Sequence, residues 1–238
     1  MNVLLIVCGV VLLAFAFKFF AMGKIKGNSE ITKKVFTITD YKEIMLEGNP
    51  QVIYEQEKSG LPHLEIEIDK NLVDLLDIKS GDGVLIIGNK KGFLPTKYII
   101  RTGSTDLETV KAKGSLTMKL LGTLNTDKLN LSLTGNGEVA CDNISCTLLT
   151  SNVSGKGTIM IKGKALRVEN IISGNGIIDQ FGMKAENVSC KISGNGNINV
   201  NVEQNLYVKI SGGGNVTYVG NPKIQQSISG SGKLIKSH

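Results

Sequence analysis

The sequence predicts an all-β protein, a β-helix or β-solenoid with coils of about 18–20 residues, and the first observation behind this prediction is a repeat. One apolar residue, one hydroxyl residue and a Gly-x-Gly turn recur six times between residues 133 and 234. The hydroxyl residues follow one another at steps of 20, 19, 20, 18 and 18 positions: Thr134, Ser154, Ser173, Ser193, Ser211 and Ser229. A period near twenty is typical of stacked repeats that bury a shared core.

Alternation within each repeat is the second observation. Leu129, Leu131 and Leu133 lie on one face of a predicted strand, and residues 188–192 and 206–210 alternate in the same way. No repeat contains an amphipathic stretch of helical length, which excludes helical leucine-rich repeats. Stacked in register, the repeats form two aliphatic core columns: Leu133, Val153, Ile172, Ile192, Ile210 and Ile228 before the glycines, and Val139, Ile159, Ile178, Ile198, Val216 and Leu234 after them.

The Gly-x-Gly segments are predicted to be tight corners, because glycine tolerates positive φ and lets neighbouring coils stack without a Cβ between them. The residue between the glycines varies, as expected at an exposed tip, and the adjacent hydroxyls are expected to bond the local backbone or each other. A third inward column is mixed: Leu131, Ser151, Asn170, Cys190, Val208 and Gln226. Its polar members indicate either a hydrogen-bonded ladder inside the coil or a side that is open to solvent.

The repeat weakens toward the N-terminus without disappearing. Residues 46–52 align with residues 133–139, with Pro50 in place of the second glycine, and this suits a capping turn on the first coil. After residue 22 the sequence predicts a linker at 23–34 and a β-helix domain at 35–236. Within the first part of this domain we expect a strand at 63–69, a short helix or irregular link at 71–78 and a turn at 80–83 that leads into a strand. A loop at 91–96 and imperfect coils over 93–128 follow.

The segment 1–22 is predicted to be a signal peptide or a transmembrane anchor, as a hydrophobic helix ahead of the β-helix. Residues 3–17 are an unbroken apolar run, and Ala16 ends an A-x-A sequence that suits signal cleavage. The lysines that follow the run, Lys18, Lys24 and Lys26, oppose export by the positive-inside rule. The apolar run still favours export to the cell envelope, periplasmic or at the cell surface, and both the cleaved and the retained form stay open.

The charge pattern and the cysteine spacing limit which partners and cofactors the sequence predicts. The formal net charge of +6 comes from Lys and Arg residues scattered among Asp and Glu without interleaved aromatic residues, so nucleic-acid binding is not predicted. Cys141, Cys146 and Cys190 lack zinc-ligand spacing and histidine neighbours, so we expect no metal and no cofactor. A Cys141–Cys146 disulfide stays open for an oxidising compartment.

Several segments, taken in order, resemble the putative auto-transporter adhesin head GIN domain family, formerly a domain of unknown function. They are residues 36–56, DKNLVDLLDIKSGDGVLII at 69–87, the run of SGxG coils, and GGGNVTYVGNPKIQQSISGSGKL at 212–234. The resemblance covers about residues 35–236. It implies a right-handed, single-stranded β-helix in an exported or membrane-attached bacterial protein, and it supplies no catalytic residues.

The first functional hypothesis is a non-catalytic, adhesin-like binding or scaffold module whose partner is a glycan, another cell-envelope polymer or a protein. Function is expected in residues that the repeats do not share. The candidates for ligand binding are the outward lysines Lys162, Lys191 and Lys209, with Tyr207 and Tyr218 nearby in sequence. Lysine can meet anionic or hydroxylated polymers, and tyrosine can stack on sugar rings.

The alternatives are a carbohydrate-active enzyme, as a polysaccharide lyase or hydrolase, and a self-assembling protein. The acidic residues of the repeats occupy different offsets, so they do not stack into the carboxylate pair that glycoside hydrolysis requires. Unpaired strand edges at the ends of a β-helix can join another copy, which makes a homo-oligomer the third hypothesis.

Overall fold

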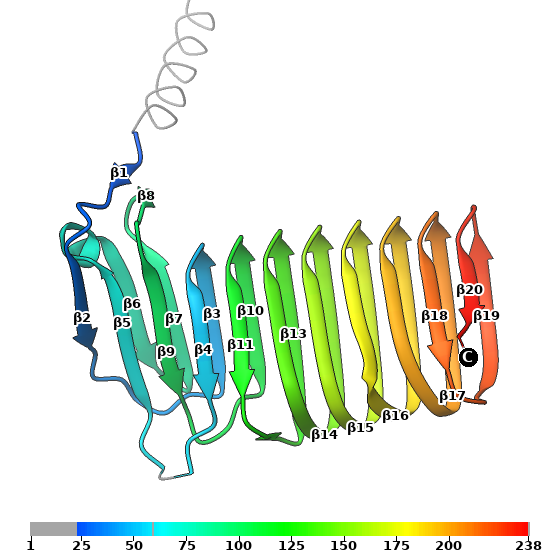
Figure 1. Ribbon diagram of the computed structural model, residues 1–238. Helices are drawn as coiled ribbons and strands as arrows, with labels where there is room; N and C mark the ends of the chain where they lie inside the picture. Colours follow the sequence, from blue (N-terminus) through cyan, green and yellow to red (C-terminus); the bar gives the residue numbers. More distant parts are fainter. Residues whose placement is uncertain (1–22, 59, 238) are drawn as a thin grey trace, which may run out of the picture.

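A computed structural model describes residues 23–58 and 60–237, which form a β-solenoid with two facing layers of strands (Figure 1). Each regular coil rises through one layer, turns at a Gly-x-Gly corner and returns through the other layer. The predicted signal peptide, anchor and hydrophobic helix fall on residues 1–22, outside the described residues. Within the ranges that the structure describes, no helix is long and apolar enough to cross a membrane.

The C-terminal half of the described chain consists of strands that pair in parallel, coil on coil. They are β13 (Lys128–Gly135), β14 (Glu138–Gly155), β15 (Thr158–Gly174), β16 (Ile177–Gly194), β17 (Asn197–Gly212), β18 (Asn215–Val219), β19 (Lys223–Ser229) and β20 (Lys233–Lys236). β14 to β17 are long because each bends at the corner opposite the glycines and so contributes to both layers. The register confirms the repeat, since Gly155, Gly174 and Gly194 pair in successive coils.

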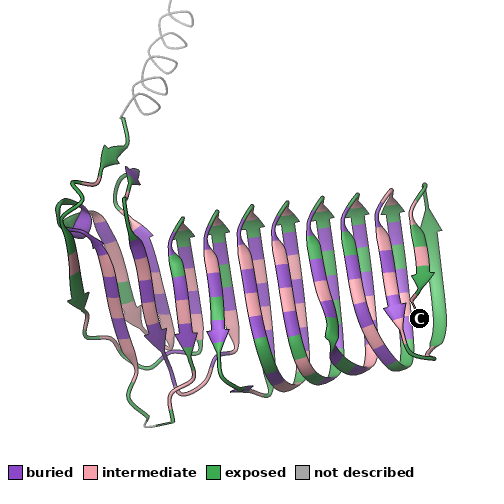
Figure 2. Cartoon of the chain, viewed as in Figure 1, coloured by how far each residue is buried: buried purple, intermediate pink, exposed green. Residues whose placement is uncertain are grey.

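The two aliphatic columns lie inside the coils, as predicted. Ile172 pairs with Ile192 and Ile192 with Ile210, and all three side chains are buried. Buried and less buried residues alternate along every regular strand (Figure 2). This alternation confirms the assignment of inward and outward faces. Each large aliphatic side chain that is fully buried stabilises the folded state by about 1.5–3 kcal/mol relative to an exposed one.

The corner glycines are required by both conformation and space, as predicted. Gly194 has a φ of 129°, and a Cβ added there would lie 2.4 Å from the carbonyl oxygen of Gly174 in the preceding coil. A Cβ on Gly196 would lie 2.6 Å from Cγ2 of Ile172. The tip amide of Asn195 donates to the oxygen of Gly174 at 2.9 Å, so the corner itself continues the stacking.

The N-terminal half of the described chain combines parallel coils with antiparallel strands, in agreement with the weaker repeat in its sequence. Its elements are β1 (Ile25–Lys26), β2 (Ile31–Val35), β3 (Glu43–Gly48), β4 (Gln51–Glu55), β5 (His63–Asp69), the 3₁₀ helix η1 (Lys70–Leu75), β6 (Leu76–Gly81), β7 (Val84–Asn89), β8 (Phe93–Leu94), β9 (Tyr98–Gly103), β10 (Thr109–Gly114), β11 (Thr117–Leu121) and β12 (Leu124–Asn125). The predicted strand at 63–69 is confirmed as β5, and the link at 71–78 divides between η1 and β6.

Coil order in space differs from coil order in sequence at this end. Leu46 pairs with Ala112, which pairs with Leu133, so the alignment of residues 46–52 with the repeat is confirmed. However, β3 also pairs with β7 and β4 with β9, so the coil of β3 and β4 lies between two others. The expectation that its turn caps the solenoid is therefore wrong. β5 and β6 cap it instead, because they run antiparallel to β9 and β7 and end the parallel stack.

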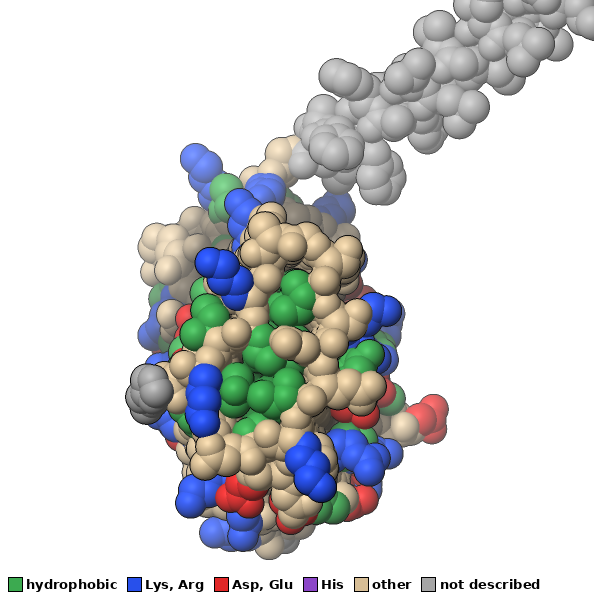
Figure 3. All heavy atoms as spheres, turned by 90° about the vertical axis from the view of Figure 1, so that its right-hand side faces the viewer, with side chains coloured by type: hydrophobic (Ala, Val, Ile, Leu, Met, Phe, Trp, Pro, Cys, Tyr) green, Lys and Arg blue, Asp and Glu red, His purple; other side chains and the backbone are tan. Residues whose placement is uncertain are grey.

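The two ends of the solenoid differ. β2 covers β5 in antiparallel pairing at the N-terminal end, whereas every residue of β19 at the C-terminal end is exposed. Apolar side chains gather at the centre of this open end, inside a polar and lysine-bearing rim (Figure 3). Among them Ile228 is 37% exposed, although it continues the column in which Ile210 is buried.

Candidate binding surface

The outer face of β15, β16 and β17 brings together three of the five predicted ligand-binding residues. Lys191 and Lys209 are direct partners in the parallel ladder of β16 and β17, and both side chains are exposed. Their Cα atoms belong to strands about 4.8 Å apart, so the two ammonium groups are neighbours. Neither forms an ion pair with any residue in the described ranges. Tyr207 lies two positions before Lys209 on the same outward face and is half-buried.

Two shallow grooves run across this face. One, of about 210 Å³, is bordered by Tyr207, Asn205 and Arg167 among others. The other, of about 220 Å³, is bordered by Ile171 and by the two stacked lysines. The face therefore offers adjacent positions for sugar-sized groups, with an aromatic ring beside one groove and two cations beside the other.

The corner hydroxyls extend this surface. Ser173, Ser193 and Ser211 form a continuous exposed ladder beside the second groove. The expectation that these hydroxyls bond the backbone or each other is wrong for the described part of the chain, where their side chains make no hydrogen bond. The reason is geometric, because each points outward from a parallel ladder whose backbone groups are already paired.

The other two predicted residues lie elsewhere. Lys162 is at the bend of β15 opposite the glycine corners, where its Nζ lies 3.3 Å from Oδ1 of Asp142. Tyr218 is only 8% exposed, and its side chain belongs to the core. The structure thus groups Lys191, Lys209 and Tyr207 and places Lys162 and Tyr218 apart from them.

The mixed inward column forms a hydrogen-bonded network inside the coil. Asn170 donates from Nδ2 to Oε1 of Gln180 at 2.8 Å, and Gln180 donates from Nε2 to Oγ of Ser151 at 3.2 Å. All three residues are buried. Of the two alternatives from the sequence, the interior one is correct, although Gln180 reaches the column from the facing layer and was not expected. Burial raises the pKa of the adjacent Cys190 thiol to about 12, so this thiol stays protonated.

One buried carboxylate organises the N-terminal end. Asp69 accepts hydrogen bonds from the amide of Ser29 at 2.8 Å, the amide of Thr96 at 2.8 Å and the hydroxyl of Thr96 at 2.6 Å. Burial acts to raise the pKa of Asp69, but these hydrogen bonds outweigh it and hold the pKa below its usual range. Asp69 therefore ties the entry segment and the loop before β9 to the cap.

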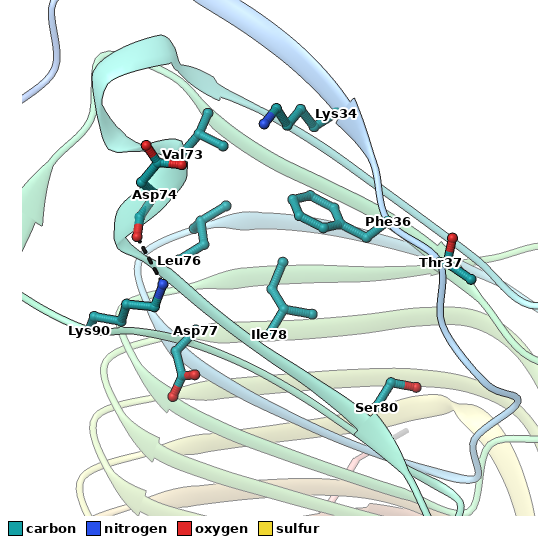
Figure 4. A pocket seen from close by; sticks show the side chains of 10 residues that line it. All are labelled: Lys34, Phe36, Thr37, Val73, Asp74, Leu76, Asp77, Ile78, Ser80 and Lys90. Carbon is teal, nitrogen blue, oxygen red and sulfur yellow. Dashed lines mark hydrogen bonds between the residues drawn. The ribbon is translucent and has the colours of Figure 1, made fainter.

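A cleft of about 440 Å³ opens at this end between the segment after β2 and the elements η1 and β6 (Figure 4). Phe36, Leu76 and Ile78 converge on it, while Lys34 and Lys90 lie at its rim. It is larger than either groove on the outer face.

The sequence of this chain matches a known protein family. Residues 40–222 match the sequence profile of the putative auto-transporter adhesin, head GIN domain. The chain belongs to this family. The head GIN domain match spans β3 to β18, including the cap strands β5 and β6 and the outer face described above, and it confirms the resemblance found in the sequence. No protein with a curated description matches the chain.

Solved structures agree with the head GIN domain assignment. A putative adhesin from Parabacteroides merdae is 30% identical, with a TM-score of 0.74, and the match covers 90% of this chain and 99% of that one. A putative lipid binding protein from Parabacteroides distasonis is 27% identical, with a TM-score of 0.77, over 91% of this chain and 100% of that one. A putative adhesin from Bacteroides fragilis, 24% identical with a TM-score of 0.83 over 89% and 99% of the two chains, shares the fold.

Two observations concern the acidic, histidine and cysteine side chains of this head GIN domain. Of the residues with a described position, no three His, Cys, Asp or Glu side chains form a group that could hold a metal ion. Cys141 and Cys146 are free thiols, and burial raises the pKa of each to about 11. These thiols are therefore protonated and poor nucleophiles at neutral pH.

Proposed function

We propose that this protein is a non-catalytic, adhesin-like module of the cell envelope that binds an acidic glycan on the outer face of β15–β17. The stacking of Lys191 on Lys209 beside Tyr207 carries the proposal. Two adjacent lysines without a carboxylate partner repel each other, and an anionic ligand relieves that repulsion. Tyrosine beside a groove offers a flat apolar surface for a sugar ring. The exposed serine ladder adds hydroxyl groups that can hydrogen-bond a polymer along the stacking direction.

The binding experiment uses a fragment of residues 23–238. We expect this fragment to fold, because the crystallised Parabacteroides merdae chain matches 90% of this chain over 99% of its own length. The probes are polygalacturonate as the acidic glycan and dextran as the neutral one, with binding measured by calorimetry at low and high salt. We expect saturable binding of polygalacturonate that weakens with salt, because exposed charges are screened.

Two matched double variants distinguish binding at this face from attraction of the ligand to the overall positive charge of the protein. Lys191→Ser with Lys209→Ser should weaken polygalacturonate binding by about tenfold, which corresponds to about 1.4 kcal/mol. Lys223→Ser with Lys233→Ser removes the same charge from the exposed last coil and should change the affinity less than about twofold. Equal losses in the two double variants, or no binding by the folded parent, would remove the assignment. Release of shorter oligosaccharides would favour the enzyme alternative instead.

We propose further that residues 1–22 direct export, either as a cleaved signal peptide or as a retained membrane anchor, which rests on the apolar run at 3–17. A reporter that is active only outside the cytoplasm, fused after residue 40 of the full chain, should be active. An expressed but inactive fusion would mean that Lys18, Lys24 and Lys26 keep the domain inside.

A further inference from the structure

The cleft at the N-terminal end is formed by two strand edges that have no further partner in the described chain. β2 pairs only with β5, and β6 pairs only with β7, so the two layers of the solenoid end on either side of the opening. Hydrogen bonds between Thr39 and Ser80, at 2.9 Å, tie the layers together beyond one end of the cleft. This cleft therefore has a floor, two walls and a closed end.

The floor of the cleft is apolar and continuous with the core. Phe36 and Ile78 pack against the buried cluster while remaining partly exposed, and Leu76 and Val73 are buried beside them. An apolar ligand in this cleft would extend the solenoid core by burying these exposed parts. Its volume of about 440 Å³ falls within the range of about 300–1,000 Å³ that small-molecule sites occupy.

The rim of the cleft carries two lysines and two aspartates, Asp74 and Asp77. The ammonium of Lys34 reaches over the cleft (Figure 4) and pairs with no carboxylate among the residues that the structure describes. Lys90 donates from Nζ to the backbone oxygen of Asp74 at 3.0 Å, which holds it at the opposite rim. Asp77 is engaged by Lys79 at 3.3 Å, whereas the exposed carboxylate of Asp74 has no ion pair within the described ranges. Lys34 is therefore the cation at the rim that is free to meet an anionic group.

A basic and apolar corner adjoins this cleft through η1. Asn71 of η1 donates to the backbone oxygen of Lys26 at 2.8 Å, and β1 pairs with β8 in parallel. The pairing gathers residues that are about 65 positions apart in the sequence, and their side chains are exposed: Lys24, Ile25, Lys26, Lys91 and Leu94. Exposed aliphatic side chains among lysines are typical of surfaces that meet anionic lipid headgroups. The corner also lies directly after the apolar segment of the sequence.

We propose that this cleft binds an amphiphile with one acyl chain and an anionic headgroup. The chain lies on Phe36, Leu76 and Ile78, and the headgroup binds the ammonium of Lys34. An extended peptide would also fit between two strand edges, but it would not need the unpaired ammonium of Lys34. The site is at the opposite end of the solenoid from Lys191 and Lys209, so it is independent of the proposed glycan face.

The test uses dodecyl phosphate below its micelle-forming concentration, with dodecanol as the uncharged analogue, on the fragment of residues 23–238. Calorimetry should show one saturable site for dodecyl phosphate and binding at least about tenfold weaker for dodecanol. Lys34→Ser should weaken dodecyl phosphate about tenfold. Ile78→Trp, at a partly exposed position of the floor, places an indole in the cleft and should abolish binding.

Control variants and lipid sources complete the design. Lys223→Ser, at the far end, and Lys191→Ser with Lys209→Ser should bind dodecyl phosphate as the parent does, which separates this site from the glycan face. Lysophosphatidylglycerol, which has one acyl chain, carried by the fragment after incubation with vesicles that contain it and separation from them would identify a membrane lipid as the natural source, and binding of dodecyl phosphate alone would identify a free amphiphile. The proposal is overturned if the folded parent does not bind dodecyl phosphate, if Lys34→Ser and Ile78→Trp bind it unchanged, or if an uncharged peptide occupies the cleft and dodecyl phosphate cannot displace it.

Discussion

The two regions of the solenoid are held together by different means. In residues 129–236 the coils stack through repeated glycine corners and aliphatic columns, and within the described part of this region Lys162–Asp142 is the one ion pair. In residues 30–128 the coils are irregular and the outer face carries ion pairs between strands, such as Lys111–Glu43 at 2.6 Å. The regular repeat is held together without a network of ion pairs on its surface, so its outward charges are available to a ligand. An imperfect one uses them for its own stability.

The largest expected effect compares two positions of one aliphatic column, one buried in the core and one at the open end. Ile192→Asp places a carboxylate in a buried position and should cost several kcal/mol or prevent folding, on the order given for buried charges. Ile228→Asp changes the same column at the open end, where the side chain is 37% exposed, and should cost about 1 kcal/mol or less. Urea unfolding of the fragment measures both. Equal costs would mean that the open end is covered in solution.

The second effect concerns a glycine corner. Gly194→Ala forces a side chain into left-handed backbone and against the Gly174 carbonyl, and we expect a loss of about 1–3 kcal/mol or more. Asn195→Asp alters the exposed tip next to it and should stay within about 0.5 kcal/mol. The midpoints of thermal unfolding rank the two variants, and a similar shift for both would contradict the role of the corner.

The repetitive region could be predicted from sequence because each of its features recurs. The columns through Leu133 and Val139, the corner glycines and the alternation of faces all follow from a period that appears six times. Strand β5 was also predictable, since HLEIEID alternates over its whole length. The outward position of Lys191 and Lys209 follows from the same alternation.

The rest depended on contacts that have no local signal. Insertion of the coil of β3 and β4 between β7/β9 and β10/β11 is decided by strand pairing across 41 to 66 residues, as in the Glu43–Val84 and Thr109–Glu43 pairs. Gln180 joins Ser151 and Asn170 only because the facing layer closes over them. The N-terminal cleft forms because β2 is the last strand of one layer and β6 is the last strand of the other. The sequence of neither strand indicates this placement by itself.

The third effect tests the N-terminal region by pH. Because hydrogen bonds lower the folded pKa of Asp69, its stabilisation is present above the ordinary carboxyl pKa and is lost as the pH falls through the folded pKa. Asp69→Asn should therefore cost about 1–3 kcal/mol at pH 7, the range for a charged hydrogen bond, and progressively less in acid. Asp142→Asn, on an exposed carboxylate of the regular region, should show no such pH dependence. Parallel curves for the parent and Asp69→Asn from pH 7 to 3 would contradict this.

The smallest effect tests whether surface ion pairs hold the irregular coils. Glu108 accepts Lys42 at 2.9 Å and Lys128 at 2.9 Å, and so joins the coils that contain β3, β10 and β13. The hydrogen bonds from Lys42 and Lys128 hold the pKa of Glu108 below its usual range, which indicates that both lysines favour the carboxylate. Glu108→Gln should lower the melting temperature slightly at low salt and by less in 1 M salt, because exposed pairs are screened. Lys156→Gln, at an exposed corner tip of the regular region, removes a charge without an ion pair and should leave the salt dependence of melting as it is in the parent. If Lys156→Gln changed that dependence as much as Glu108→Gln does, the two regions would not differ in how they use charge.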